Sequence, residues 1–293
     1  MNNQTKKINL ITQLNWKPWL FLTPALTLLT IFLFIPILMV FYLSFTDGNI
    51  IQISWIGLKN YRKLLIDPDF SQIIFNTIYF SIFTIIPSLI IPLFLAILLN
   101  QNLPLKGFFR IAYFLPSITS LVAMGLGFRW LFQNNGTINQ ILLKLNFYPI
   151  NWLNSTFWAM PVLILFSTWR QIGFNLVVFL TGLQIIPQNR YEAAELDGAN
   201  FWAKIWYITL PALKPTLIFA TITTTIFTLK SFEQVYIMTG GGPSNSTNIL
   251  AFYIYELAFR QFNFGYASAT TTILLLVALI LVSLQLFTTK DNE

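Results

Sequence analysis

Six long apolar runs dominate this 293-residue chain and decide which solvent it folds in. Each run reaches the ~20 residues that a helix needs to cross a hydrocarbon core of ~30 Å. Only 9% of the residues are charged and 56% are hydrophobic, so polar side chains cannot cover a water-facing globule of this size. The sequence therefore predicts an integral membrane protein with spans at residues 19–45, 73–99, 108–132, 157–183, 216–238 and 267–287.

The apolar runs are expected to be helices rather than barrel strands. Barrel strands alternate lipid-facing and lumen-facing residues over about ten positions, and a run such as Leu274 to Leu281 shows no alternation. We expect the first run to be retained as a helix, because its apolar stretch is too long for the h-region of a signal peptide. The connections between runs are too short to hold another folded domain. The predicted fold is all-α, with one membrane domain at residues 1–293.

Lysine and arginine residues set the predicted orientation. With a cytoplasmic N-terminus, nine of them fall in cytoplasmic segments and five outside, as the positive-inside rule favours. We therefore expect both termini in the cytoplasm. The net charge of +7 is explained by this bias and by anionic headgroups, so it requires no nucleic acid partner.

Missing residue types restrict the chemistry. The chain has no cysteine and no histidine, which excludes disulfides, thiolate nucleophiles, Cys/His zinc sites and histidine proton relays. No lysine follows the glycine pattern of a phosphate-binding loop. We predict that the chain is not an enzyme and that it binds no ATP, metal or other cofactor itself.

A polar segment at residues 187–213 separates the fourth and fifth apolar runs, and we call it the coupling loop. Pro187 suits the first position of a helix, Gly198 suits a left-handed helix end, and Asn200 suits the cap of a second helix. The loop is expected to be two short cytoplasmic helices. Interfacial helices that lie in headgroups usually carry basic polar faces, whereas three carboxylates dominate here. A protein partner with basic residues therefore fits the loop better.

Ionisable residues inside the predicted spans mark a candidate substrate pathway. A charged group that faces lipid at mid-membrane costs about 2.5–3.5 kcal/mol, so these groups must face protein, water or the interface. On helical spacing they share faces with amides and an aromatic ring, which suits the hydroxyls and ring faces of a sugar. Alternatively, Glu233 forms an ion pair with a neighbouring cation, and the amides join helices. The candidate residues are Arg170, Gln171, Phe174, Asn175, Lys230, Glu233 and Gln234.

A glycine cluster follows the fifth apolar run at Gly240, Gly241, Gly242 and Pro243. It is either a gate element or a flexible exit from the span. The intramembrane charges would also suit a self-sufficient channel or secondary carrier, but we find no internal repeat of the kind that such carriers show.

The coupling loop resembles the cytoplasmic signature of the membrane subunits of ATP-binding-cassette importers. That signature runs E-A-A, three residues, G, nine residues, I-x-L-P, and this chain matches it without a gap. Further similarities to the first permease of carbohydrate importers of the maltose, glycerol-phosphate and multiple-sugar type are Trp55 to Tyr61, Asn76-Thr77, Tyr113 to Pro116 and Tyr236 to Pro243. The residues that match the signature or flank it are Glu192, Ala193, Ala194, Asp197, Gly198, Ala199, Ile208, Leu210 and Pro211.

The resemblance implies a permease subunit in a bacterial inner membrane that imports a sugar or related polyol. It also implies a second permease subunit, a dimer of ATPase subunits that use ATP and magnesium, and an extracytoplasmic solute-binding protein as partners. The coupling loop would dock in a groove of one ATPase, and closure of the ATPases would open the membrane cavity outward. The fourth and fifth spans carry the sugar-contacting positions in this family.

Overall fold

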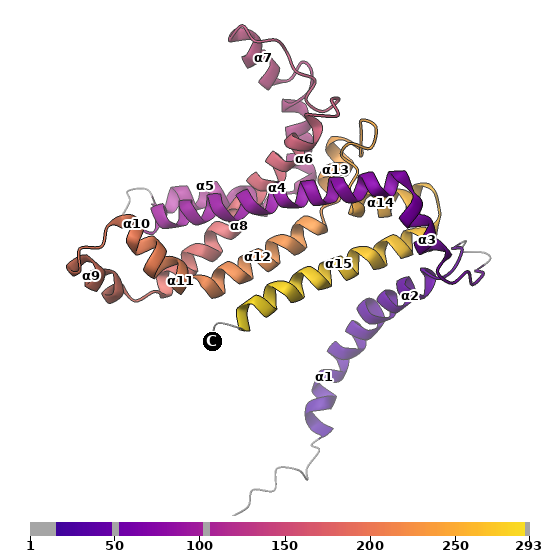
Figure 1. The fold of residues 1–293 in the computed structure, drawn as a ribbon, viewed down its shortest axis with the longest axis horizontal. Coiled ribbons are helices and arrows are strands. Elements are labelled where there is room, and N and C mark those ends of the chain that lie inside the picture. Colours follow the sequence, from indigo (N-terminus) through magenta and orange to yellow (C-terminus); the bar gives the residue numbers. More distant parts are fainter. Residues whose placement is uncertain (1–15, 49–52, 102–105, 291–293) are drawn as a thin grey trace, which may run out of the picture.

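The computed structural model describes residues 16–48, 53–101 and 106–290, and this part of the chain is helical almost throughout (Figure 1). Its β-structure is a single bridge between Thr46 and Trp55. The all-α membrane fold is confirmed. The α-helices are α1 Trp16–Leu29, α2 Ile35–Leu43, α3 Lys59–Ile66, α4 Pro68–Leu99, α5 Lys106–Ile118, α6 Leu121–Leu131, α7 Thr137–Lys144, α8 Ala159–Ile185, α9 Gln188–Leu196, α10 Phe201–Lys204, α11 Leu210–Ala212, α12 Lys214–Leu229, α13 Glu233–Met238, α14 Leu250–Tyr255 and α15 Phe264–Lys290. Three π-helical turns, Thr30–Phe34, Ile205–Thr209 and Glu256–Arg260, continue helices without a break in the chain.

Four continuous helices are long and apolar enough to cross a membrane. They are Trp19–Leu43, Pro68–Leu99, Ala159–Ile185 and Phe264–Phe287, and they correspond to four of the six predicted spans. Two bent helix pairs would raise the number of spans to six if each pair crosses the membrane once. They are Gly107–Ile118 with Leu121–Leu131, and Phe201–Ala212 with Lys214–Leu229.

The third predicted span, residues 108–132, is not one straight helix. Its two halves, Gly107–Ile118 and Leu121–Leu131, meet at 98°. The break has a local cause, because Ser120 adopts an extended ψ of 123° and its side chain accepts a hydrogen bond from Ala123 N, which starts a new helix. The prediction of a continuous helix here is wrong.

The fifth predicted span, residues 216–238, is also interrupted. α12 ends at Leu229, and Lys230 is its C-terminal capping residue. α13 then begins at Glu233 after Phe232, whose φ of −127° is not helical. Lys230 and Glu233 therefore lie at two helix ends instead of inside one helix. At such ends the backbone has unpaired polar groups, so the break is expected to face protein or water rather than lipid.

The central bundle consists of α4, α5, α8, α12 and α15, which run side by side (Figure 1). Small residues allow close approach of its helices. A side chain at Gly182 would clash with Leu213 and Thr216, where α8 meets the start of α12. Beside this contact, Leu176, Phe179, Leu180 and Leu183 of α8 are buried in an apolar cluster with Ala96 and Ala220. Tight α8 packing therefore positions the polar residues that lie midway along this helix.

The first helix, α1 with α2, stands away from the bundle, and α2 touches it through α15 (Figure 1). Its large apolar side chains from Trp19 to Tyr42 are exposed. An apolar helix of this kind is stable in lipid or against another membrane helix, since burial of its surface from water is strongly favourable.

Candidate functional site: two cavities, a loop and a helical elbow along helix α8

A cavity of about 510 Å³ lies between α5, α8, α12 and α13, and we call it the cationic cavity. Six of the seven predicted pathway residues line it: three belong to α8, and the other three come from the two sides of the break in the fifth predicted span. Aromatic rings of Phe114, Phe174 and Phe227 complete much of its wall. The six residues are Arg170, Gln171, Phe174, Lys230, Glu233 and Gln234.

The charged groups of this cavity are not paired with one another. Among the described residues the ion pairs are Lys204–Glu195 and Arg260–Glu256, so Glu233 forms no ion pair with Arg170 or Lys230. Arg170 Nε and Gln171 Oε1 are buried and have no hydrogen-bond partner in the described part of the chain. A buried polar group without a partner costs about 1–3 kcal/mol. These atoms are therefore positioned to bind water or a polar ligand.

The cavity wall is fixed by contacts between helices. Ser117 Oγ donates a hydrogen bond of 2.9 Å to Arg170 O, which joins α5 to α8. The rings of Phe174 and Phe227 meet edge to face with centroids 5.8 Å apart, which joins α8 to α12. A rigid wall that combines amide, guanidinium and aromatic groups suits a ligand with hydroxyl groups and an apolar face.

Asn175, the seventh predicted pathway residue, is not among the residues that line the cavity. It is 1% exposed, and its Nδ2 donates to Ser88 O at 2.6 Å and to Thr224 Oγ1 at 3.0 Å. Asn175 therefore joins α8 to α4 and α12. This is the alternative role given above for the amides, in which they form hydrogen bonds between helices.

The coupling loop folds as an elbow of two helical pieces, as predicted. Gly198 has a φ of +77° after α9, and Asn200 Oδ1 accepts a hydrogen bond of 2.8 Å from Ala203 N at the start of α10. No other atom would meet a Cβ at Gly198, so the glycine is required by backbone conformation rather than by space. Lys204 Nζ and Glu195 Oε1 brace the elbow at 2.7 Å.

A shallow groove of about 540 Å³ runs across this elbow. Five of the nine signature residues line it, namely Ala193, Ala194, Asp197, Ile208 and Pro211. Tyr207, which also lines the groove, is 82% exposed, and Leu196 of the same elbow is 90% exposed. Large apolar side chains at such exposure are suited to contact with lipid or with another protein.

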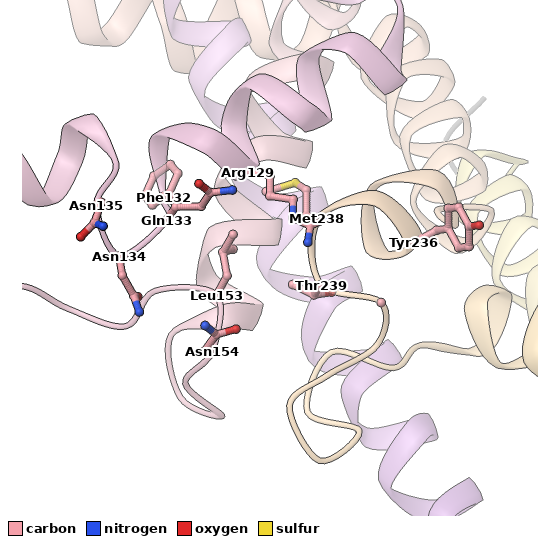
Figure 2. Close-up of a pocket in the computed structure, with 11 residues that line it drawn as sticks. Arg129, Phe132, Gln133, Asn134, Asn135, Leu153, Asn154, Tyr236, Met238 and Thr239 are labelled. Carbon is pink, nitrogen blue, oxygen red and sulfur yellow. The ribbon is translucent and has the colours of Figure 1, made fainter.

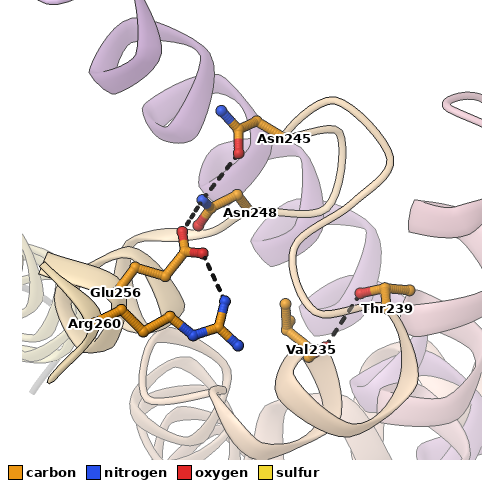
Figure 3. A network of polar contacts seen from close by, with 6 residues as sticks. All are labelled: Val235, Thr239, Asn245, Asn248, Glu256 and Arg260. Carbon is orange, nitrogen blue, oxygen red and sulfur yellow. Dashed lines mark hydrogen bonds and ion pairs between the residues drawn. The ribbon is translucent and has the colours of Figure 1, made fainter.

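The loop at residues 239–249, here called the glycine loop, is held in place by many hydrogen bonds. Asn76 Nδ2 on α4 donates to Asn245 O at 2.7 Å and to Asn248 O at 3.0 Å. Asn248 Nδ2 donates to Glu256 at 2.7 Å, and Arg260 pairs with the same carboxylate (Figure 3). These hydrogen bonds join the glycine loop to α4 and to the π-helical turn Glu256–Arg260.

A second cavity, of about 510 Å³, was not anticipated from the sequence (Figure 2). We call it the amide cavity, because Gln133, Asn134, Asn135 and Asn154 line it together with Arg129 and Tyr236. Arg129 lies at the end of α6, and its Nη1 donates to Ile237 O at 3.1 Å. The sequence signal was the run of three amides directly after the third apolar segment.

These features follow one another along α8. Leu153 and Asn154 of the amide cavity precede the helix, Arg170 of the cationic cavity lies near its middle, and the coupling loop follows its end at Ile185. A helix of this length rises about 40 Å, enough to cross a membrane. An all-helical membrane fold with a polar cavity midway along a spanning helix is typical of a membrane transport subunit.

Comparison with known proteins identifies the family. Residues 74–290 match the family described as binding-protein-dependent transport system inner membrane component, and the chain belongs to this family. It is 38% identical to the lactose transport system permease protein LacF of Rhizobium radiobacter over 94% of each chain. It is 37% identical to the arabinooligosaccharides transport system permease protein AraP of Bacillus subtilis, over 92% of this chain and 88% of that one.

Solved structures agree on the fold. A chain of a bacterial ABC transporter involved in import of the acidic polysaccharide alginate superposes with a TM-score of 0.84 and 24% identity, covering 94% of this chain and 96% of the other. A second structure of a bacterial alginate transporter, in complex with an alginate pentasaccharide-bound periplasmic protein, has a TM-score of 0.81 at 24% identity and covers 92% of each chain. The structures support the fold, and the family match with the two permease relatives identifies this protein as a permease subunit of a binding-protein-dependent transport system.

Proposed function

We propose that this permease imports a sugar or sugar oligomer through the cationic cavity, driven by ATP hydrolysis in separate ATPase subunits that use magnesium as their cofactor. The observation that carries the proposal is the lining of that cavity, where Phe174 and Glu233 occur together with two buried polar atoms that have no partner among the described residues, Arg170 Nε and Gln171 Oε1. The names of the relatives, for lactose and arabino-oligosaccharides, support the carbohydrate class. A second permease subunit and an extracytoplasmic binding protein would complete the assembly.

The cargo is tested with the complete transporter in proteoliposomes. The companion binding protein is first screened against lactose, arabinotriose and an alginate oligosaccharide, and the bound sugar is then used for uptake. We expect uptake to need ATP, and Arg170→Gln or Glu233→Gln to reduce it. Rapid flux through this chain alone, without an ATPase, would instead establish a self-sufficient channel or carrier.

We also propose that the coupling loop transmits force from an ATPase subunit. Its exposed Leu196 and Tyr207 and its acidic face support this role. Glu192→Ala or Gly198→Asp should leave membrane insertion normal but separate ATP hydrolysis from uptake. Asn189→Ala is the matched control, because Asn189 is an exposed polar residue of the same loop outside the signature. Wild-type uptake in both signature variants would contradict this role.

The proposed orientation places six spans in an inner membrane, with both termini and the coupling loop in the cytoplasm. The chain has no cysteine, so single cysteines report sidedness directly. Leu196 and Tyr148 are 90% and 91% exposed and lie beyond opposite ends of α8. In intact cells an impermeant maleimide should label Tyr148→Cys but not Leu196→Cys. The reverse pattern would invert the topology.

A further inference from the structure

A polar cavity of about 360 Å³ lies where the start of α4 meets α14 and the start of α15, and we call it the acidic socket. Lys63 contributes an ammonium group to its lining, and the glycine loop contributes Asn245 and Asn248. The lining also contains three carboxylates, those of Asp67, Asp69 and Glu256. The socket is therefore lined by more negative than positive charge, and the glycine loop forms part of its wall.

The negative charge of the socket is only partly neutralised within the protein. Arg260 pairs with one oxygen of Glu256 at 3.2 Å (Figure 3). Lys63 forms no ion pair within the described ranges, and its Nζ lies over the ring of Tyr266, 4.7 Å from the centroid. The side chain of Asp69 is exposed and accepts no hydrogen bond from the described residues. Asp69 is therefore available to a cation from outside the chain.

The second unpaired carboxylate, that of Asp67, is held in a fixed position. Its Oδ1 accepts a hydrogen bond of 3.0 Å from Asp69 N, and its Oδ2 accepts one of 2.8 Å from the Tyr266 hydroxyl. Burial and the nearby charges of Asp67 and Asp69 raise the pKa of Tyr253 to about 12. Neighbouring carboxylates disfavour a phenolate because like charges repel. The potential inside the socket is therefore negative, which favours a cationic ligand.

Asn248 gives an independent indication that the socket takes a hydrogen-bond donor. This residue is 1% exposed, and its Nδ2 donates to Asn245 and to Glu256 (Figure 3). Its Oδ1 has no donor in the described part of the chain. A buried acceptor without a donor costs about 1–3 kcal/mol. A ligand that brings N–H groups to this wall is therefore favoured.

The spacing of the carboxylates suits an organic cation better than a metal ion. No three Asp or Glu residues of the described ranges are grouped closely enough to hold a metal ion. A metal ion needs several oxygens at about 2.0–2.6 Å. An ammonium or guanidinium group instead distributes several N–H donors among acceptors that lie further apart. Lysine and arginine side chains carry these groups.

Helix α4 separates the acidic socket from the coupling loop. Asn100, directly after the end of α4, lines another cavity together with Tyr191 and Lys204 of the coupling loop. The 32 residues of α4 rise about 48 Å, enough to cross a membrane. In the proposed orientation the socket therefore faces the outside, where the binding protein approaches. Of the four carboxylates that this orientation places in outer loops, three line the socket.

We propose that the acidic socket docks a lysine or arginine side chain of the extracytoplasmic binding protein. This inference rests on the proposed function, because the orientation and the binding protein both come from it. It adds the place and the chemistry of docking: the incoming cation contacts Asp69 and Asp67, next to the glycine loop. Docking should therefore weaken as salt rises, since exposed charge pairs are screened.

The test varies the charge of Asp69 in the complete transporter, reconstituted in nanodiscs with its sugar-loaded binding protein. The readout is the concentration of binding protein that gives half-maximal ATPase stimulation, at low and at physiological salt. Asp69→Asn removes one charge and Asp69→Lys reverses it, at an exposed side chain. Asp47→Asn is the matched control, because Asp47 is an exposed carboxylate of an outer loop that does not line the socket.

We expect the half-maximal concentration to rise about twofold to fivefold in Asp69→Asn, as for the loss of one exposed charge pair, and about fivefold to twentyfold in Asp69→Lys. Both shifts should shrink at higher salt, and the control should match the wild type. A photocrosslinker on Asp69→Cys should capture the binding protein, whereas one on Leu196→Cys in the coupling loop should not.

Three results would contradict these expectations. An equal shift in Asp47→Asn, or no shift in Asp69→Lys, would overturn the docking site. Calcium that raises the denaturation temperature of the wild type but not of Asp69→Asn would assign the socket to a metal ion and overturn it as well. A wild-type transporter that imports no sugar, and whose ATPase does not respond to the binding protein, would instead refute the proposed function itself.

Discussion

Gly173 is the position where a single methyl group should disturb the cationic cavity most directly. It faces α5, and a Cβ there would lie 2.5 Å from Ser117 Oγ, 2.9 Å from Phe114 Cα and closer still to Tyr113 O. Real Cβ atoms are not found within 3.0 Å of such neighbours, so α5 would have to move by at least about half an ångström. Two of its residues, Phe114 and Ser117, line the cavity.

The expected cost of Gly173→Ala is about 1–3 kcal/mol, the usual penalty for inserting a methylene into a well-packed core. Alanine also gains about 1 kcal/mol over glycine inside a helix, so the net effect is smaller but remains unfavourable when the backbone must move. The Ser117–Arg170 hydrogen bond should lengthen at the same time.

Gly127→Ala provides the matched control for this prediction. Gly127 lies inside α6, and nothing would approach an added Cβ within 4 Å, so alanine should be neutral or stabilising there. The assay is thermal denaturation of the purified transporter, followed by tryptophan fluorescence, together with sugar uptake. The reasoning fails if Gly173→Ala denatures at or above the temperature of Gly127→Ala and imports sugar at the wild-type rate.

Three further predictions concern the loops. Asn76→Ala should increase hydrogen exchange in the glycine loop, because two carbonyls lose their donor at a cost of about 1–3 kcal/mol; Gln72→Ala, which removes one exposed contact to Ser244 O, should change it little. Gly198→Ala should lower the free energy of unfolding by about 1–2 kcal/mol, because alanine is strained at the positive φ of this position, and it should lower the amount of sugar imported per ATP hydrolysed. Gly198→Asn should have a milder effect, since asparagine tolerates this conformation. Hydrogen bonds from the Ser54 hydroxyl and N–H hold the pKa of Asp47 below its ordinary 3.8, so the Asp47–Ser54 contact should be constant above about pH 5 and weaken only as pH falls below about 4. Limited proteolysis across pH would detect that loss, and Ser54→Ala, which removes the hydroxyl donor but keeps the N–H donor, should reduce the pH dependence.

The apolar pattern was sufficient to place the long helices. α4, α8 and α15 begin and end within a few residues of their predicted spans, because a membrane helix satisfies its backbone hydrogen bonds locally. The elbow of the coupling loop was equally predictable. Gly198 and Asn200 act through their own backbone and side-chain geometry, which requires no distant contact.

The breaks at Ser120 and after Leu229 were not predictable from hydropathy. Both breaks lie inside runs that are apolar enough to span a membrane, and their local causes, the Ser120 cap and the non-helical Phe232, leave the mean hydropathy of the runs high. The position of Asn175 was likewise not predictable from the sequence. Helical spacing places it one residue from Phe174, yet that 100° step turns it from the cavity toward α4 and α12.

The sequence alone determined that this protein folds in lipid, that its spans are helices, and that thiol, imidazole and phosphate-loop chemistry are absent. Those conclusions depend on composition and on local periodicity, which need no knowledge of contacts. The tertiary structure decided which polar groups meet in a cavity, which join helices, and that Arg129 turns toward Ile237. A cavity exists only between elements that are distant in the chain, so its lining is settled by how the helices pack against one another.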